Sequence, residues 1–272
     1  MSDDWGHSAL PVIRPSMPNE GFGMSQLSER PITIVLGATG AVGSQLSRRL
    51  AQRGVQVVVA GRRLEAAEAL ANEIDGVPMQ VDARDFDQVA KAFSEAKKLG
   101  TVNGAVNCAG SILLKPAHLT TAADLNDTIA TNLTSAFATV RSSVPVMRRN
   151  GGSVVLVSSA AASIGLANHE AIAAAKAGVE GLVRSAATTY AHNGIRVNAV
   201  APGLVASAMS QRIVENPKSL ETSLALHPLG RVGQPEEVAA LIDFFLGENS
   251  SWVTGQIWGV DGGLATLKTR QS

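Results

Sequence analysis

A glycine-rich segment, GATGAVG, is the first part of the sequence whose residue types point to a chemical task. Its glycines, Gly37, Gly40 and Gly43, lie between a short apolar run and a helical pattern. Glycines permit a tight turn and close backbone approach, so the N–H groups and positive dipole end of the following helix can hold a pyrophosphate. Glycines also occur in ordinary turns that bind nothing. Dinucleotide binding is favoured here because the glycine segment directly follows the first apolar run. The residues predicted to contact the cofactor here are Gly37, Thr39, Gly40, Ala41, Val42 and Gly43.

Two adjacent arginines indicate which dinucleotide is bound. The second apolar run ends in VVVAGRR, where a carboxylate would bind the ribose hydroxyls of NAD. Gly61 is uncharged, however, and Arg62 and Arg63 follow it directly. Their guanidinium groups suit a 2′-phosphate, which they can hold through paired hydrogen bonds. The alternative is that both are solvated arginines at the start of a helix. We predict NADP(H) as the cofactor.

The order of the surrounding segments predicts the fold that must position these residues. Seven short apolar runs predict strands: ITIVLG, VQVVVAG, VPMQVD, VNGAVN, GSVVLVSS, IRVNAVAP and GQIWGVDGG. Helical spacing predicts helices over residues 41–53, 64–74, 86–98, 122–149, 168–192 and 235–246. Strands separated by helices run parallel, with right-handed crossovers and both faces covered. We therefore predict a single-domain α/β fold with a doubly wound, Rossmann-type, seven-stranded parallel sheet. It should bind ligands beyond the carboxyl ends of its strands, where the strand order reverses.

Composition divides the chain into three regions. Residues 1–29 are rich in Ser, Pro, Gly and Asn without periodicity, which predicts a flexible N-terminal arm before a domain over residues 30–272. Within that domain, residues 204–228 are predicted to form a mobile lid over the pocket. This segment combines Met, Ile and Leu with few charges, which favours a largely apolar small-molecule substrate.

Several further motifs, taken in order, resemble those of the short-chain dehydrogenase/reductase family over about residues 30–263. They are VDARD, NCAG, NLTSAF, VLVSS, VNAVAPGLVASAM, HPLGRVGQPEEVA and TGQIWGVDGG. The resemblance implies an adenine contact at Asp82, a backbone segment against the cofactor within NCAG, and a loop after residue 201 that holds the nicotinamide amide. The further cofactor residues that it implies are Asp82, Ala83, Asn107, Ala109, Gly110, Lys176, Pro202, Gly203, Val205 and Ser207. The glycine spacing GxxGxxG, with Ala41 at the usual middle glycine, is closer to the extended or atypical branches.

The same resemblance implies a catalytic set of Asn132, Ser159 and Lys176, but the family's principal acid is missing. A tyrosine is expected thirteen residues after Ser159 and four before Lys176, and the residue there is Ile172. Tyr190, the one tyrosine of the chain, follows Lys176 by fourteen residues and cannot substitute for it.

His169 is a candidate replacement for the missing acid. The spacing His169-x6-Lys176 resembles the Tyr-x6-Lys pattern of the enoyl reductases in the same superfamily. Histidine can donate a proton near neutral pH. Alternatively, His169 is an ordinary polar residue at the start of a helix. If it is the donor, replacing it should lower turnover.

The missing acid restricts the classes of substrate that we expect. Positioned acid–base catalysis contributes roughly 10²–10⁴-fold, so its loss weakens an enzyme without abolishing it. Hydride added to a conjugated carbonyl leaves a delocalised enolate that hydrogen bonds can hold. We predict an NADP(H)-dependent oxidoreductase acting on an activated ketone or an α,β-unsaturated carbonyl compound. The alternative is a weak or inactive NADP(H)-binding protein that serves as a sensor or subunit. Retention of Ser159 favours the enzyme.

Charge and composition exclude other classes of partner. Lys plus Arg and Asp plus Glu number 23 each, so no bulk charge favours nucleic acid or an anionic membrane. A single cysteine, Cys108, allows no intramolecular disulfide and no cysteine-based metal cluster, and we expect no metal. No apolar run reaches about 18 residues and the start lacks a signal-peptide pattern, which predicts a soluble, cytoplasmic protein. The helices over 122–149 and 168–192 resemble the family's dimerising pair and predict a homotetramer.

Overall fold

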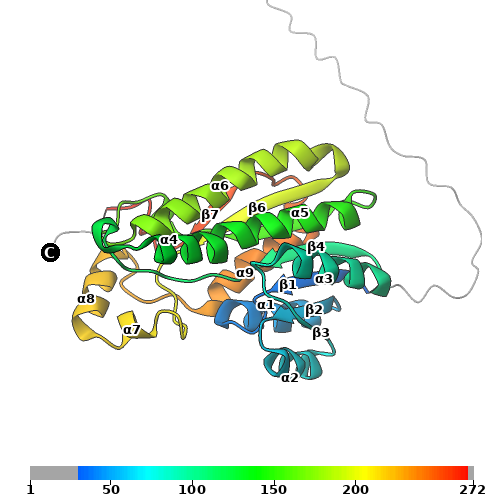
Figure 1. Cartoon of the computed structure of the whole chain (residues 1–272), viewed down its shortest axis with the longest axis horizontal. Coiled ribbons are helices and arrows are strands. Elements are labelled where there is room, and N and C mark those ends of the chain that lie inside the picture. Colours follow the sequence, from blue (N-terminus) through cyan, green and yellow to red (C-terminus); the bar gives the residue numbers. More distant parts are fainter. Residues whose placement is uncertain (1–29, 269–272) are drawn as a thin grey trace, which may run out of the picture.

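The central feature of the fold is a parallel sheet in which strand order reverses once. The computed structural model describes residues 30–268, so the predicted arm at 1–29 lies outside the described residues (Figure 1). The sheet has the order β3-β2-β1-β4-β5-β6-β7, with every pair parallel. Its strands are β1 (Ile32–Leu36), β2 (Gln56–Gly61), β3 (Val77–Gln80), β4 (Val102–Asn107), β5 (Gly152–Val157), β6 (Ile195–Pro202) and β7 (Ile257–Val260). All seven predicted strands and the predicted fold class are confirmed.

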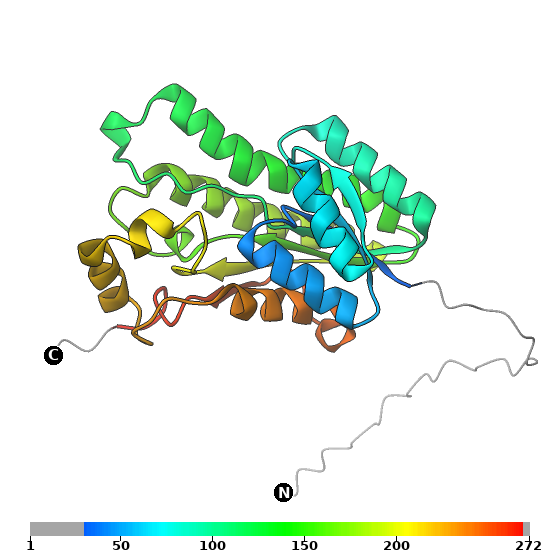
Figure 2. The same cartoon turned by 90° about the horizontal axis from the view of Figure 1, so that it is seen from below.

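Helices cover both faces of the sheet (Figure 2). One face carries α1 (Ala41–Gln52), α2 (Leu64–Ile74) and α9 (Pro235–Leu246), and the other carries α3 (Phe86–Leu99), α5 (Ser135–Met147) and α6 (Glu170–Tyr190). Alternate residues of a strand join opposite cores: Ile34 packs with Phe93 of α3, and Val35 packs with Leu46 of α1. Burial on both faces explains why the strands read as continuous apolar runs.

The helix predicted over residues 122–149 is interrupted, and this prediction was wrong in that detail. The structure has α4 (Ala122–Ile129), a π-helical turn over Ala130–Thr134, and then α5. The buried side chain of Asn132 causes competition within the helix, because its Nδ2 donates to the Thr128 carbonyl at 2.9 Å. An α-helix would give that carbonyl to the N–H of residue 132. π-helical turns of this kind are frequent at functional sites.

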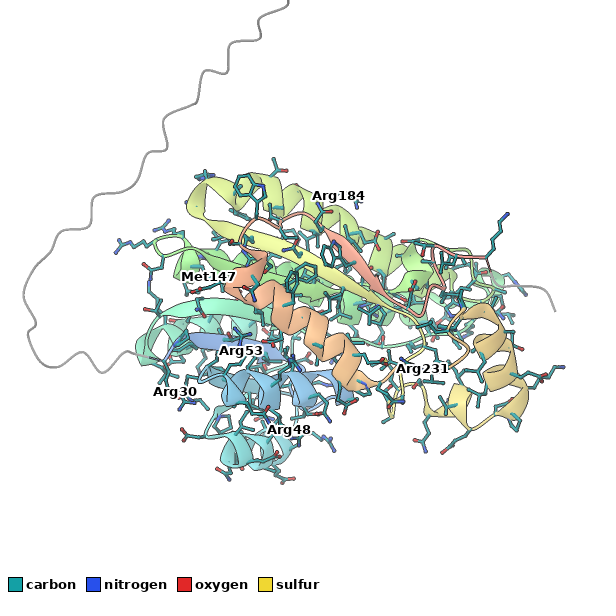
Figure 3. The ribbon with its side chains drawn as sticks, turned by 180° about the vertical axis from the view of Figure 1, so that it is seen from behind. Arg30, Arg48, Arg53, Met147, Arg184 and Arg231 are labelled. Atoms are coloured by element: carbon teal, nitrogen blue, oxygen red, sulfur yellow. The ribbon has the colours of Figure 1, made fainter. Side chains whose placement is uncertain are left out.

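Ion pairs hold α1 between α2 and α9. Arg48 of α1 binds Glu73 of α2 at 2.6 Å, and the buried carboxylate of Asp243 in α9 accepts from both Arg49 and Arg53 (Figure 3). The C-terminal half of the helix that follows the glycine segment is therefore paired with both neighbouring helices.

A helical excursion follows β6 at the carboxyl end of the sheet. It contains α7 (Gln211–Val214) and α8 (Pro217–Leu226), which lie together at one end of the molecule (Figure 1). Within residues 30–268, no helix is long and apolar enough to cross a membrane.

Candidate active site

A cavity of about 330 Å³ opens where the strand order reverses. Its walls are the segments that follow β1, β4, β5 and β6, together with the π-helical turn and α6. Parallel sheets bind ligands at this point because consecutive crossovers leave it in opposite directions. The predicted site residues that line the cavity are Gly40, Ala41, Val42, Gly43, Ala109, Gly110, Asn132, Ser159, Lys176, Pro202, Gly203, Val205 and Ser207.

The glycine turn is shaped by its contact with the segment after β4. Gly37 has φ +73°, and a Cβ there would lie 2.6 Å from the backbone nitrogen of Ala109. Gly40 precedes α1 without a side-chain cap, and the first turn of that helix carries no acidic residue. The N–H groups of Ala41, Val42 and Gly43 therefore lack intrahelical partners and border the cavity. This arrangement fits an anionic pyrophosphate.

Asn107 positions the segment after β4 from outside the cavity. Its buried Oδ1 accepts from the Ala109 N–H at 2.9 Å, and its Nδ2 donates to Ser135 Oγ at 3.0 Å. The Cys108 N–H donates to the Leu36 carbonyl at 2.8 Å and joins the ends of β4 and β1. Burial raises the pKa of the Cys108 thiol to about 12, so this side chain is neutral where it lines the cavity.

Ser159 and Lys176 both lie at the carboxyl end of β5 and line the cavity. Ser159 follows the strand, and its Oγ accepts from the Ala161 N–H at 3.2 Å, which leaves the hydroxyl hydrogen available. Lys176 lies in α6, and its buried Nζ donates to the Val157 carbonyl at 2.7 Å. Burial lowers the pKa of this ammonium to about 8. The lysine is thus a stronger acid than one on the surface.

Ile172 lies one helical turn before Lys176 and lines the same cavity. Its side chain is buried. An aliphatic group therefore stands at the position where the motif spacing predicts a phenol.

Asn132 uses its whole amide to fix the loop after β4. Its Oδ1 accepts from the Ser111 N–H at 3.2 Å, while Nδ2 donates to Ser111 Oγ at 3.1 Å as well as to Thr128. The side chain supports the cavity wall.

His169 is not among the described residues that line the cavity. Helix α6 begins at Glu170, and His169 precedes it with φ −106° and ψ 11°, which is outside helical geometry. Its Nδ1 lies 2.8 Å from the Ala167 carbonyl, and because a carbonyl only accepts, this nitrogen carries the hydrogen. The placement favours the interpretation of His169 as a polar residue at a helix start.

Several predicted cofactor residues lie beyond the cavity. Arg62 and Arg63 are exposed after β2. A Cβ at Gly61 would lie 3.3 Å from Thr39 Oγ1, so the absence of a side chain there allows Thr39 of the glycine turn to pack closely against the end of β2. Asp82 binds Arg84 at 2.7 Å, and this hydrogen bond lowers the pKa of its carboxyl group. Ala83 is buried in the core.

His227 closes the segment that contains α7 and α8. The Leu204 N–H donates to His227 Nε2 at 3.1 Å, and Nδ1 donates to the Ser223 carbonyl at 2.6 Å. The imidazole is therefore neutral and ties both ends of the segment together. Further along the chain, Arg231 (labelled in Figure 3) binds Glu237 in the first turn of α9 at 2.6 Å and lowers the pKa of that carboxyl to about 2. The motif HPLGR was visible in the sequence, but nothing in the pattern indicated this contact.

The sequence did not point to several other residues that line the cavity. They stand next to the predicted site residues, and the motifs assign them no role. They are Cys108, Ser111, Ile112, Val157, Ser158, Leu204, Ala208, Met209 and Ser210. Among residues 30–268, no group of three or more His, Cys, Asp or Glu side chains could hold a metal ion.

Comparisons with known proteins agree on one family. The family profile described as Enoyl-(Acyl carrier protein) reductase matches residues 37–265. The chain is 36% identical to the 3-oxoacyl-[acyl-carrier-protein] reductase FabG of Thermotoga maritima over 247 residues, which cover 87% of this chain and 98% of that protein. It is also 36% identical to carbonyl reductase family member 4 of Danio rerio over 244 residues, with coverage of 87% and 98%. The solved structure of a short-chain type dehydrogenase/reductase from Mycobacterium ulcerans superposes with a TM-score of 0.83 and 27% identity, covering 89% of this chain and 93% of that one.

The His227→Leu variant tests whether the imidazole holds the helical segment. It should lower the free energy of unfolding by about 1–3 kcal/mol, because the Leu204 N–H and the Ser223 carbonyl lose their partner. It should also speed proteolytic cleavage between residues 204 and 228. Urea unfolding and limited proteolysis measure both effects. The exposed His192→Leu change is the matched control and should stay within about 0.5 kcal/mol of the wild type. Equal effects at the two positions would contradict the assigned role.

Proposed function

This chain belongs to the short-chain dehydrogenase/reductase family, and we propose from that premise that it is an NADP(H)-dependent oxidoreductase. Its substrate is an activated ketone or an α,β-unsaturated carbonyl compound. The observation that carries the proposal is the cavity itself, because it combines the open N-terminus of α1 with Ser159 and Lys176. An anion site beside a hydroxyl and an ammonium group suits a dinucleotide next to a carbonyl substrate.

The cofactor assignment rests on the first turn of α1, which borders the cavity, and on two arginines that lie beyond it, after β2. The free N–H groups of α1 hold the pyrophosphate, and the exposed Arg62 and Arg63 bind the 2′-phosphate beside Gly61. Lys176 binds the nicotinamide ribose, and the segment from Pro202 to Ser207 receives the nicotinamide amide, as the family resemblance implies. When bound, the cofactor supplies the hydride. The relatives' names describe reductases and dehydrogenases, in keeping with this assignment.

The catalytic residues that we propose are Asn132, Ser159 and Lys176. The Ser159 hydroxyl donates to the substrate oxygen, and Asn132 holds the loop after β4 in place. Ile172 donates nothing, so substrates whose reduced form is a delocalised oxyanion are favoured over isolated ketones. The position of His169 outside the cavity lining supports its assignment as a polar residue of the helix start rather than as the proton donor.

The segment over residues 204–228 acts as a lid on the substrate. Leu204, Val205 and Met209 from this segment line the cavity with apolar side chains, which suits a largely apolar ligand. Closure of such segments excludes water from the reacting groups.

A second candidate function is an NADP(H)-binding protein with little redox activity, acting as a sensor or subunit. The observation that favours it is Ile172, because an aliphatic group at this place provides no general acid. The Ser159 hydroxyl hydrogen, which is available for a substrate oxygen, favours an enzyme instead.

Cofactor preference follows from the charges after β2. NADPH should bind at least about tenfold more tightly than NADH, because charge-assisted hydrogen bonds to a phosphate contribute about 1.5–3 kcal/mol. Arg62→Ala should remove most of that difference and leave NADH affinity unchanged. Calorimetric titration measures both cofactors. Arg148→Ala, an exposed change after α5, is the control. Equal affinity of the wild type for the two cofactors would contradict the proposal.

Substrate preference follows from the group at residue 172. With NADPH, kcat/KM for cyclohexenone should exceed that for cyclohexanone by about tenfold or more, because the enolate needs less immediate protonation than an alkoxide. The decrease in NADPH absorbance gives the rate, and mass spectrometry of the product shows whether C=C or C=O is reduced. Ser159→Ala should lower the rate by about 10²–10³-fold. NADPH binding without turnover of any enone or ketone would establish the second candidate function instead.

The protein is proposed to be a homotetramer. Phe137 of α5 is 50% exposed, and Trp252 before β7 is 99% exposed, so apolar side chains stand on two separate faces. Light scattering should give about four times the 28.1 kDa of one chain. Phe137→Glu should reduce that mass, because a charge on the α5 face would disrupt the interfaces between subunits that this face forms. A monomer mass for the wild type would refute the assembly.

A further inference from the structure

Lys176 is the one charged side chain among the described residues that line the cavity. It is buried, and within residues 30–268 its ammonium makes a single hydrogen bond, to the neutral Val157 carbonyl. An ammonium group has three N–H donors, so two remain for other partners. A buried cation attracts an anion strongly because the surroundings screen little. The cavity thus contains a positive charge without a counter-charge.

The groups around Lys176 do not supply that counter-charge. From the end of β4, Cys108 contributes a neutral thiol, and from the π-helical turn Asn132 contributes an amide already bound to Ser111 and Thr128. From α6 itself, the Glu180 carboxylate accepts from Ser158 Oγ at 2.9 Å. Ile172 adds only aliphatic surface. The two remaining N–H donors must find their partners on ligands: in the proposed complex one binds the nicotinamide ribose and the other is left for the substrate.

We propose that Lys176 itself replaces the missing acid: its ammonium group binds the oxyanion that forms on the substrate and donates a proton to it, with Ser159 as the second donor. This inference rests on the proposed function and deepens it. It also narrows the substrate to neutral carbonyl compounds whose reduced form is an oxyanion. A cationic substrate such as an iminium ion would be repelled by the buried ammonium.

The proton transfer balances without a further reactant. An N–H bond of Lys176 breaks and its electron pair stays on nitrogen, while a lone pair of the oxyanion forms the new O–H bond. Lys176 is left as a neutral amine and regains a proton from water. The hydride that creates the oxyanion is the one supplied by the cofactor of the proposed function. The step itself changes no oxidation state.

The lowered pKa of Lys176 is consistent with this role. At about 8, the group is protonated at neutral pH and yet gives up its proton more readily than a surface lysine. The donor form is present below that pKa and is lost as the pH rises through it. Turnover that depends on Lys176 as an acid should therefore fall above about pH 8.

The charge can be tested without turnover by binding 4-nitrophenol, whose phenolate form is coloured. In the wild type, with and without NADP⁺, the bound probe should ionise at least about one pH unit lower than the free probe, because an opposite charge at close range favours the anion. Lys176→Met should abolish this shift, and Lys97→Met, which removes an exposed ammonium from α3, should retain it. An unshifted or unbound probe in the wild type, or a retained shift in Lys176→Met, would overturn the proposal.

A second variant separates holding the oxyanion from donating the proton. Lys176→Arg keeps a positive charge but cannot release a proton near neutral pH. It should keep the shift of 4-nitrophenol and lose enone turnover by about 10²–10⁴-fold. In Lys176→Ala, added ethylammonium should restore part of the turnover. If Lys176→Arg reduces the enone at the wild-type rate, the proton comes from elsewhere and the proposal is wrong.

The His169→Ala variant tests the alternative that His169 donates the proton. If this change, and not Lys176→Arg, removes the decline of turnover at high pH, then His169 is the donor and the proposal fails. Failure of the proposed function has a different signature, since the wild type would then oxidise no NADPH with any carbonyl compound while the 4-nitrophenol shift persisted.

Discussion

The arrangement of the active-site edge depends on a backbone contact that leaves no room for a side chain. Gly37, in the left-handed region, packs against the backbone of Ala109, and the Cys108 N–H joins the end of β4 to that of β1. These strands are neighbours although β2 and β3 separate them in the sequence. The crossovers leave them in opposite directions, so their ends open a crevice and the first turn of α1 faces it. Every other group of the site is placed relative to this contact.

The electrostatics of the cavity come from one buried charge. Taking an ammonium group out of water costs several kcal/mol, and a single hydrogen bond from Lys176 to the Val157 carbonyl offsets only part of that. The Lys176 side chain is held in this position because α6 packs on the sheet beside α5 and Nζ is hydrogen-bonded at the end of β5. A site that carries such an uncompensated charge is prepared for an anion before any ligand arrives. Ile172 lines the same cavity with an aliphatic side chain where the motif spacing predicts a phenol.

The outer wall of the cavity is held more weakly than its floor. The floor consists of strand ends inside two apolar cores, whereas the segment with α7 and α8 has no fully buried helix residue of its own. His227 joins the two ends of this segment to each other, and the Arg231–Glu237 pair ties the residues that follow it to α9. Elements with few buried contacts open at low free-energy cost, which suits a wall that must admit a substrate.

The sequence by itself determined the sheet, the glycine-rich turn after β1 and the absence of a phenol between Ser159 and Lys176. Parallel strands are apolar on both faces and glycine turns have a fixed spacing, so local pattern was sufficient. Only the tertiary structure decided three other points. The π-helical turn arises from a side-chain bond of Asn132 that competes with the backbone. His169 lies outside the cavity lining because α6 starts one residue later, where helical spacing no longer applies. His227 acts on Leu204, 23 residues away, through a contact that no local periodicity encodes.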